Sequence, residues 1–261
     1  MIINLDADRL STRSVRAGGD PLACGGVGLT AICGSAEVLD RAEQRRTAGI
    51  VIRPEAVGAF TGGSAEGLDR LVDLDSLITY GSERLATAAA AGRSGAEVLD
   101  LLEHELVRSL TDRPEPDAGC RAAITQLRSG RSVTEVADCL GVGQSTLTRH
   151  FRRAVGLTPK RYQRLLRLEC AVGLARRSQD PDWATIAVRS GCYDQAHLDH
   201  EFGELTGLSP TRWHRAGADS PYHVRLSDDF LQDLGPSGRQ DGDHERRAIP
   251  QRDTVSALSR R

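Results

Sequence analysis

The amino-acid sequence predicts an α+β protein whose C-terminal half is all-α. Residues 1–80 contain short Val- and Ile-rich runs that end at glycine or proline, such as GGVGLTAICG at 25–34 and AGIVIRP at 48–54. Such runs are typical of short β-strands. Residues 120–216 instead repeat apolar residues every three or four positions, which indicates helices. Between the two regions, TDRPEPDAG at 111–119 is acidic and has two prolines, which predicts a linker.

The chain is therefore divided into three predicted parts. Residues 1–116 form a small mixed α/β domain with helices expected at 82–91 and 95–110, and residues 117–216 form the helical domain. Residues 217–261 are rich in Asp, Arg, Gly and Ser and predict a disordered tail. Residues 117–216 hold 15 Lys and Arg against 10 Asp and Glu, whereas residues 1–116 hold 12 against 18. This asymmetry suggests that only the helical domain meets a polyanion.

Helix starts in the helical domain are marked by capping residues. Ser132 with Glu135 three places later forms a capping box, and Gly141 ends that helix. A second helix is expected at about 144–155, and a long helix follows it. Thr158 precedes a proline that favours the first helical position of the long helix. Further helices are expected to begin after Asp182, Asp194 and Ser209.

A tandem repeat is the most informative feature of the helical domain. LTRHFRRAVGLTP at 147–159 returns as LDHEFGELTGLSP at 198–210, an offset of 51 residues. The preceding alanine and glycine recur at an offset of 50, so the second turn holds one extra residue. Each copy is a helix, a turn with glycine and a second helix. This is the pattern of a helix-turn-helix.

The second helix of the first copy carries a polar outer face. Ser145, Thr148, Arg149 and Arg152 are spaced i, i+3, i+4 and i+7, opposite the apolar stripe around Phe151. Arginine is able to pair with guanine through two hydrogen bonds, and threonine can contact a thymine methyl group or a phosphate. A solvated face on a helical bundle would show the same pattern. The tandem repeat around the helix favours DNA binding.

Residues 120–216 resemble the DNA-binding domain of the AraC/XylS family of bacterial transcription regulators, in which a long helix joins two helix-turn-helix units. The most specific part is GCYDQAHLDHEFGELTGLSPTRWHR at 191–215. The resemblance implies recognition helices at about 144–154 and 195–205, which enter successive major grooves about 10 bp apart. It implies double-stranded operator DNA as the partner, RNA polymerase as a further partner of an activator, and homodimers.

The candidate DNA-binding residues lie on the two recognition helices. They are Gln144, Ser145, Thr148, Arg149, Arg152 and Arg153 on the first, and Gln195, Ala196, His197, Asp199 and His200 on the second. The second helix lacks the arginine that the family commonly places there. Asp199, Glu201 and Glu204 are expected to repel phosphates. This helix is therefore expected to select the base sequence, while the first helix supplies the phosphate contacts that hold the DNA. Cys192, His197 and His200 follow the recognition-helix template, and no metal is expected there.

Residues 1–116 leave two alternatives open. They resemble, loosely, the sensor domains that precede such DNA-binding domains, in part a cupin-like fold, but no metal-cupin histidine cluster is present. A sensor of a small-molecule effector and a dimerisation or packing module both fit. A competing function for the whole chain is a non-enzymatic interaction module that modulates another regulator through its acidic N-terminal domain.

Several protein classes are not expected. The first 116 residues contain no Gly-rich phosphate loop, G-x-S-x-G or H-E-x-x-H motif, so neither an enzyme nor a cofactor is expected. No run approaches the ~20 apolar residues of a spanning helix, and no secretory signal is apparent. The six scattered cysteines form no C-x-x-C pair, which indicates reduced thiols in a cytoplasm.

Overall fold

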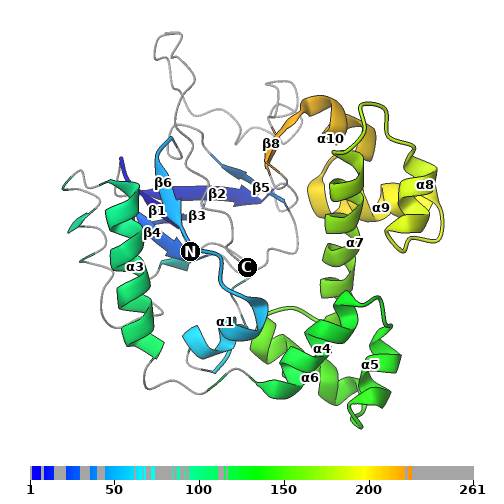
Figure 1. Cartoon of the computed structure of the whole chain (residues 1–261), viewed down its shortest axis with the longest axis horizontal. Coiled ribbons are helices and arrows are strands. Elements are labelled where there is room, and N and C mark those ends of the chain that lie inside the picture. Colours follow the sequence, from blue (N-terminus) through cyan, green and yellow to red (C-terminus); the bar gives the residue numbers. More distant parts are fainter. Residues whose placement is uncertain are drawn as a thin grey trace.

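The computed structural model has the predicted α+β architecture, with small antiparallel sheets ahead of a helical domain (Figure 1). It describes residues 2–6, 9–14, 22–29, 36–39, 45–61, 63–66, 68, 72–73, 84, 87–88, 91, 94–110, 115, 117–220 and 223–224. Most of the helix predicted at 82–91 therefore lies outside the described residues.

The first sheet is antiparallel and has the strand order β6-β1-β4-β7. Its strands are β1 (Ile2–Asn4), β4 (Val27–Leu29), β6 (Thr47–Gly49) and β7 (Val72–Asp73). Ile3 on the central strand β1 pairs with Val27 on one side and Ala48 on the other. The sequence predicts a strand at 48–54. Only its first two residues pair in the sheet, as part of β6, and Pro54 starts helix α1.

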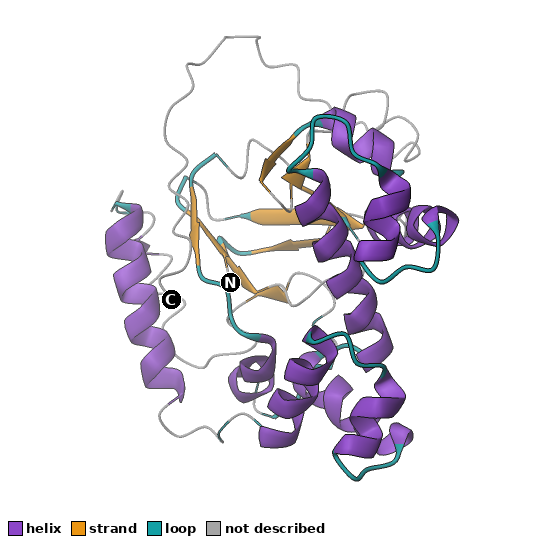
Figure 2. Cartoon of the chain, turned by 45° about the vertical axis from the view of Figure 1, so that its right-hand side comes forward, coloured by secondary structure: helices purple, strands orange, loops and turns teal. Residues whose placement is uncertain are grey.

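A second antiparallel sheet has the order β3-β2-β5, formed by β3 (Leu22–Cys24), β2 (Leu10–Ser14) and β5 (Glu37–Leu39). Helix α3 (Gly95–Leu110) covers the first sheet, because its apolar stripe of Val98, Leu102 and Leu106 packs into the core that contains Ile3. The short helix α1 (Pro54–Phe60) leads away from the sheets towards the helical domain (Figures 1 and 2).

Seven helices form the helical domain. They are α4 (Ala118–Arg128), α5 (Val133–Cys139), α6 (Gln144–Val155), α7 (Pro159–Ala175), α8 (Trp183–Arg189), α9 (Gln195–Thr206) and α10 (Pro210–Ala216). The long helix α7 connects two groups, with α4, α5 and α6 at one end and α8, α9 and α10 at the other (Figure 1). Each group has its own apolar core, one around Phe151 and one around Phe202.

The predicted caps define these helices. The Ser132 hydroxyl accepts a hydrogen bond from the Glu135 backbone N–H, and the Ser132 N–H donates to the Glu135 carboxylate. Thr158, Asp182, Asp194 and Ser209 likewise accept backbone N–H groups in the first turns of their helices. The structure thereby confirms the helix starts that the sequence predicts, since an N-cap oxygen satisfies N–H groups that lack an intrahelical partner.

Beyond α10 the chain forms a short antiparallel ribbon of β8 (Ala218–Ser220) and β9 (His223–Val224). These strands fall within the first part of the segment that composition predicts to be disordered, because composition does not reveal local backbone pairing. The rest of that segment lies outside the described residues. Within the described ranges, no helix combines the length and the apolar character that crossing a membrane requires.

Candidate nucleic-acid interface

The two predicted recognition helices, α6 and α9, are held by equivalent aromatic contacts. Phe151 of α6 packs against Tyr162, with ring centroids 5.5 Å apart, and Phe202 of α9 packs in the same way against Trp213 at 5.8 Å. The turn before α6 spans residues 140–143 and the turn before α9 spans 190–194, so the extra residue lies where the repeat places it. Both helices end at a glycine with positive φ, 86° and 73°.

The outer face of α6 is polar and positively charged. Gln144, Ser145, Arg149, Arg152 and Arg153 are exposed, and Thr148 is half-buried. The Gln144 side chain donates to the Thr134 hydroxyl of α5 at 3.0 Å, which fixes it at the start of the helix. Guanidinium groups next to hydroxyls suit both phosphate oxygens and base edges.

Residues 58–66 of the N-terminal region contact the C-terminal end of this face. Arg153 donates from Nε to the Gly63 carbonyl at 2.9 Å, and Nε of Arg152 lies 3.9 Å from the Glu66 carboxylate. Helix α1 packs closely on α6. A Cβ atom added at Gly58 would lie only 3.2 Å from the Ala154 carbonyl oxygen, so the two backbones are nearly in contact there. Two of the predicted phosphate-binding arginines are therefore engaged by residues 58–66.

Both α6 and α9 end against residues of the N-terminal region. The last carbonyl groups of a helix have no intrahelical partner. The Ala65 N–H donates to the Arg153 carbonyl at 2.7 Å, and the Ala36 N–H donates to the Leu205 carbonyl, also at 2.7 Å. The first domain thus satisfies a terminal carbonyl on α6 and another on α9.

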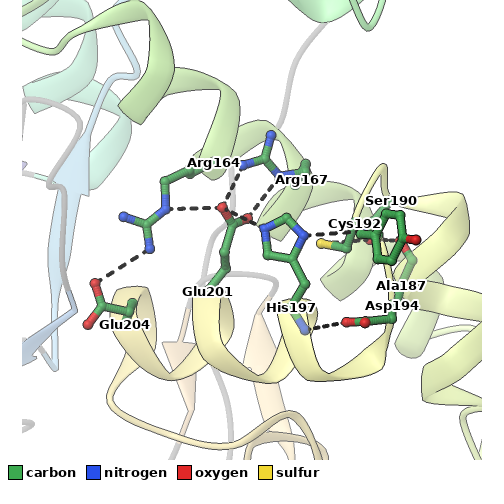
Figure 3. A network of polar contacts seen from close by, with 10 residues as sticks. Arg164, Arg167, Ala187, Ser190, Cys192, Asp194, His197, Glu201 and Glu204 are labelled. Atoms are coloured by element: carbon green, nitrogen blue, oxygen red, sulfur yellow. Dashed lines mark hydrogen bonds and ion pairs between the residues drawn. The ribbon is translucent and has the colours of Figure 1, made fainter.

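The outer face of α9 differs from that of α6. Gln195, Ala196, Asp199 and His200 are exposed. The ring of His197 is held within the protein, since its Nδ1 accepts the Tyr193 N–H at 3.2 Å and its Nε2 lies 3.4 Å from Glu201 (Figure 3). Of the candidates on α9, His197 is the one whose ring joins the preceding turn to the helix.

The expectation that Glu201 and Glu204 repel phosphates is wrong, because both carboxylates pair with arginines of α7 (Figure 3). Arg167 donates to both oxygens of Glu201 at 2.8 and 2.6 Å. Arg164 lies 3.2 Å from Glu201 and 3.6 Å from Glu204. The Glu201 side chain is only 10 % exposed. Its arginine partners are more than thirty positions away, and no local sequence signal links them.

Electrostatics favours the ionised form of this pair. Burial disfavours a charged Glu201, but the hydrogen bonds and charge of Arg167 outweigh it, so the pKa of Glu201 is lowered. The same hydrogen bonds raise the pKa of Arg167. Burial raises the pKa of the neighbouring Cys192 thiol. In the described part of the chain, no three His, Cys, Asp or Glu side chains are grouped to hold a metal ion.

Comparison with known proteins agrees with this geometry. Residues 136–216 match the family model described as a helix-turn-helix domain. One similar solved structure is the C-terminal domain of AraT, a response regulator from Geobacillus stearothermophilus, which is 22% identical and covers 44% of this chain and 99% of that one. Its TM-score of 0.37 is too low to establish a common fold. No curated protein matches the chain. The family match confirms the resemblance of the helical domain to AraC-type regulators and supports a DNA-binding transcription regulator.

Proposed function

We propose that this chain, whose residues 136–216 form a helix-turn-helix domain of the AraC type, is a sequence-specific transcription regulator that reads two successive major grooves with α6 and α9. The observation that carries the proposal is the repeated scaffold. Each of the two helices is held by an aromatic pair at equivalent positions of the repeat, Phe151 with Tyr162 of α7 and Phe202 with Trp213 of α10, and its outer face is polar and exposed. Two such helices read more base pairs than one.

The two helices make different kinds of contact with DNA. On α6, Arg149 pairs with a guanine, while Arg152 and Arg153 contact phosphates and fix the register. Gln144, Ser145 and Thr148 add contacts near the start of that helix. On α9 the contacts are sequence-selective, because its exposed candidates carry no arginine: Gln195, Ala196, Asp199 and His200, with His197 beside them.

The test is selection of duplexes from a random pool by the full chain at about 50–100 mM salt, where phosphate contacts still contribute strongly. Arg149→Ala and Arg149→Lys are then compared on the selected duplex. Lysine keeps the charge but loses the fork that pairs with guanine. Both variants are expected to lose preference at one base pair and to keep nearly the wild-type salt slope, because that slope reports phosphate contacts. Failure of the wild-type chain to enrich any sequence would contradict the proposal.

A protein-interaction module is the second candidate function. The acidic first domain and the arginine-free face of α9 favour it, since neither is suited to phosphates. Salt dependence separates the two candidates. DNA binding through Z phosphate contacts gives a log–log slope of about −0.9Z, whereas docking on another regulator need not.

We further propose that residues 1–116 control access of α6 to DNA, with or without a small-molecule effector, and pair two copies of the chain. The contacts of Glu66 with Arg152 and of Gly63 with Arg153 support the first part. Glu66→Gln is expected to strengthen binding to every duplex, whereas Glu103→Gln, an equal charge change at an exposed position on α3, is not.

Light scattering of the full chain tests pairing of two copies. An activator would also contact RNA polymerase.

A further inference from the structure

We infer that Glu201 is a positioning residue: its contacts with Arg164 and Arg167, here called the Glu201 bridge, fix α9 on α7 and so set the spacing between the two grooves that the protein reads. This inference rests on the proposed two-groove function. It concerns the geometry between the recognition helices rather than any contact with DNA.

The Glu201 bridge has the geometry of a rigid joint. The Arg167 guanidinium meets both carboxylate oxygens of Glu201 through Nε and Nη2, a planar two-point contact that fixes orientation as well as distance (Figure 3). Arg164, one turn earlier on α7, reaches the same carboxylate from a second direction and extends to Glu204. Rotation or sliding of α9 against α7 would break these contacts, because a two-point contact depends on orientation as well as distance.

The bridge also includes the turn that precedes α9. His197 links Glu201 to the Tyr193 backbone, and Asp194 caps the helix through the His197 N–H at 2.8 Å. The aliphatic part of Arg167 packs beside Gly191, where an added Cβ atom would lie 3.7 Å from Cδ of Arg167. The linker helix, the turn and the recognition helix are thus connected through one carboxylate.

The first unit has no counterpart of this bridge among the described residues. The repeat aligns Glu201 with His150, which is exposed on α6. Helix α6 instead ends on the first domain through Arg153 and Ala65. The same scaffold is therefore held in two ways, and the orientation of α9 depends on α7.

Energetics points to geometry rather than stability as the role of the bridge. Burying an ion pair costs desolvation that its attraction only partly repays, and well-packed apolar residues of similar size are often as stable. A buried carboxylate between two half-buried arginines is consequently a poor way to gain stability. It is an effective way to define one arrangement of two helices.

The experiment measures how strictly the protein requires its spacing. Affinity is determined for the selected duplex and for duplexes with one base pair inserted or deleted between the two recognised segments, which turns one segment by roughly 35° relative to the other. The wild-type chain is expected to lose about tenfold or more in affinity on the altered duplexes, about the cost of one mismatched contact. Glu201→Gln keeps the shape but removes the charge, and is expected to reduce this loss to about threefold.

Arg167→Lys is the second variant, since it keeps the charge and loses the planar fork. His150→Gln is the matched control at the equivalent position of α6 and is expected to behave as wild type. A merely stabilising role would lower the melting temperature and leave spacing preference unchanged. If either variant folds and still discriminates spacing as wild type does, within twofold, the inference is wrong. If the wild-type chain selects no duplex at all, the proposed function fails first.

Discussion

Replacing Gly156 by alanine is expected to weaken the contact between residue 65 and the end of α6. Gly156 follows α6 with φ of 86°, and a Cβ atom there would lie 2.8 Å from the Ala65 carbonyl oxygen. Neighbouring backbone atoms must move to avoid this contact. Gly141 is a matched control, because it also has a positive φ, 66°, and nothing lies within 4 Å of an added Cβ atom.

The structure sets the size of the effect. Either substitution places a side chain in the left-handed region, which costs about 1–2 kcal/mol. At Gly156, displacement of residue 65 also weakens the hydrogen bond from Ala65 to the Arg153 carbonyl, whose loss costs about 0.5–1.5 kcal/mol. Gly156→Ala is therefore expected to lower the free energy of unfolding by roughly 1 kcal/mol more than Gly141→Ala does.

Urea unfolding of both variants, followed by circular dichroism, measures this difference through the midpoint and slope of the transition. Affinity for a random duplex is measured in parallel, and Gly156→Ala is expected to bind more tightly because Arg152 and Arg153 are released for phosphates. Equal destabilisation by the two substitutions, together with unchanged DNA affinity, would refute the docking of the first domain on α6.

Four further outcomes are expected. Arg149→Ala should cost about 1–3 kcal/mol at one base pair of the selected duplex, measured by competition between single-base variants of that duplex. Arg152→Ala should weaken binding to all duplexes and flatten the log–log salt slope by about 0.9, and a wild-type slope would contradict its phosphate contact. Because the pKa of Glu201 is lowered from its ordinary value of 4.5, its stabilisation is present above that pH and is lost as pH falls further; acid unfolding curves of Glu201→Gln should therefore be less steep there than those of wild type. Burial raises the pKa of the Cys120 thiol to about 12, so a maleimide at pH 8 should label the exposed Cys139 in the folded chain and leave Cys120 unmodified, as mass spectrometry of peptides would show.

Local signals were sufficient to predict the helical domain. Capping by Ser132 and Glu135 acts within one turn, and a glycine such as Gly156 ends a helix through its own backbone conformation. The α6 and α9 boundaries consequently agree with the prediction to within a residue. The apolar pairs that orient both helices also recur at a fixed offset, which made the repeat visible without any knowledge of tertiary structure.

Contacts between distant segments were not predictable in this way. A glutamate at position 201 looks like any solvated residue of a recognition helix, and only the packing of α9 on α7 brings it to Arg167. The same holds for Arg153, whose partner at Gly63 belongs to another domain. The sequence thus showed which faces of the helices are charged. It did not show whether a given charged side chain contacts solvent, DNA or another part of the chain.

The hydrogen bond between Ala36 and Leu205 also affects how the chain folds during synthesis. About 170 residues separate these two positions, so at roughly 5–20 residues per second the ribosome needs about 10–30 s to make the second after the first. The carbonyl of Arg153, which pairs with Ala65, is made earlier. Residues 36 and 65 and α6 are therefore synthesised before α9, whereas α10, whose Trp213 packs on Phe202 of α9, is synthesised after it. Contacts this distant in sequence slow folding. We therefore expect refolding of the full chain from urea to show the contact between residue 36 and the end of α9 forming in the slowest phase.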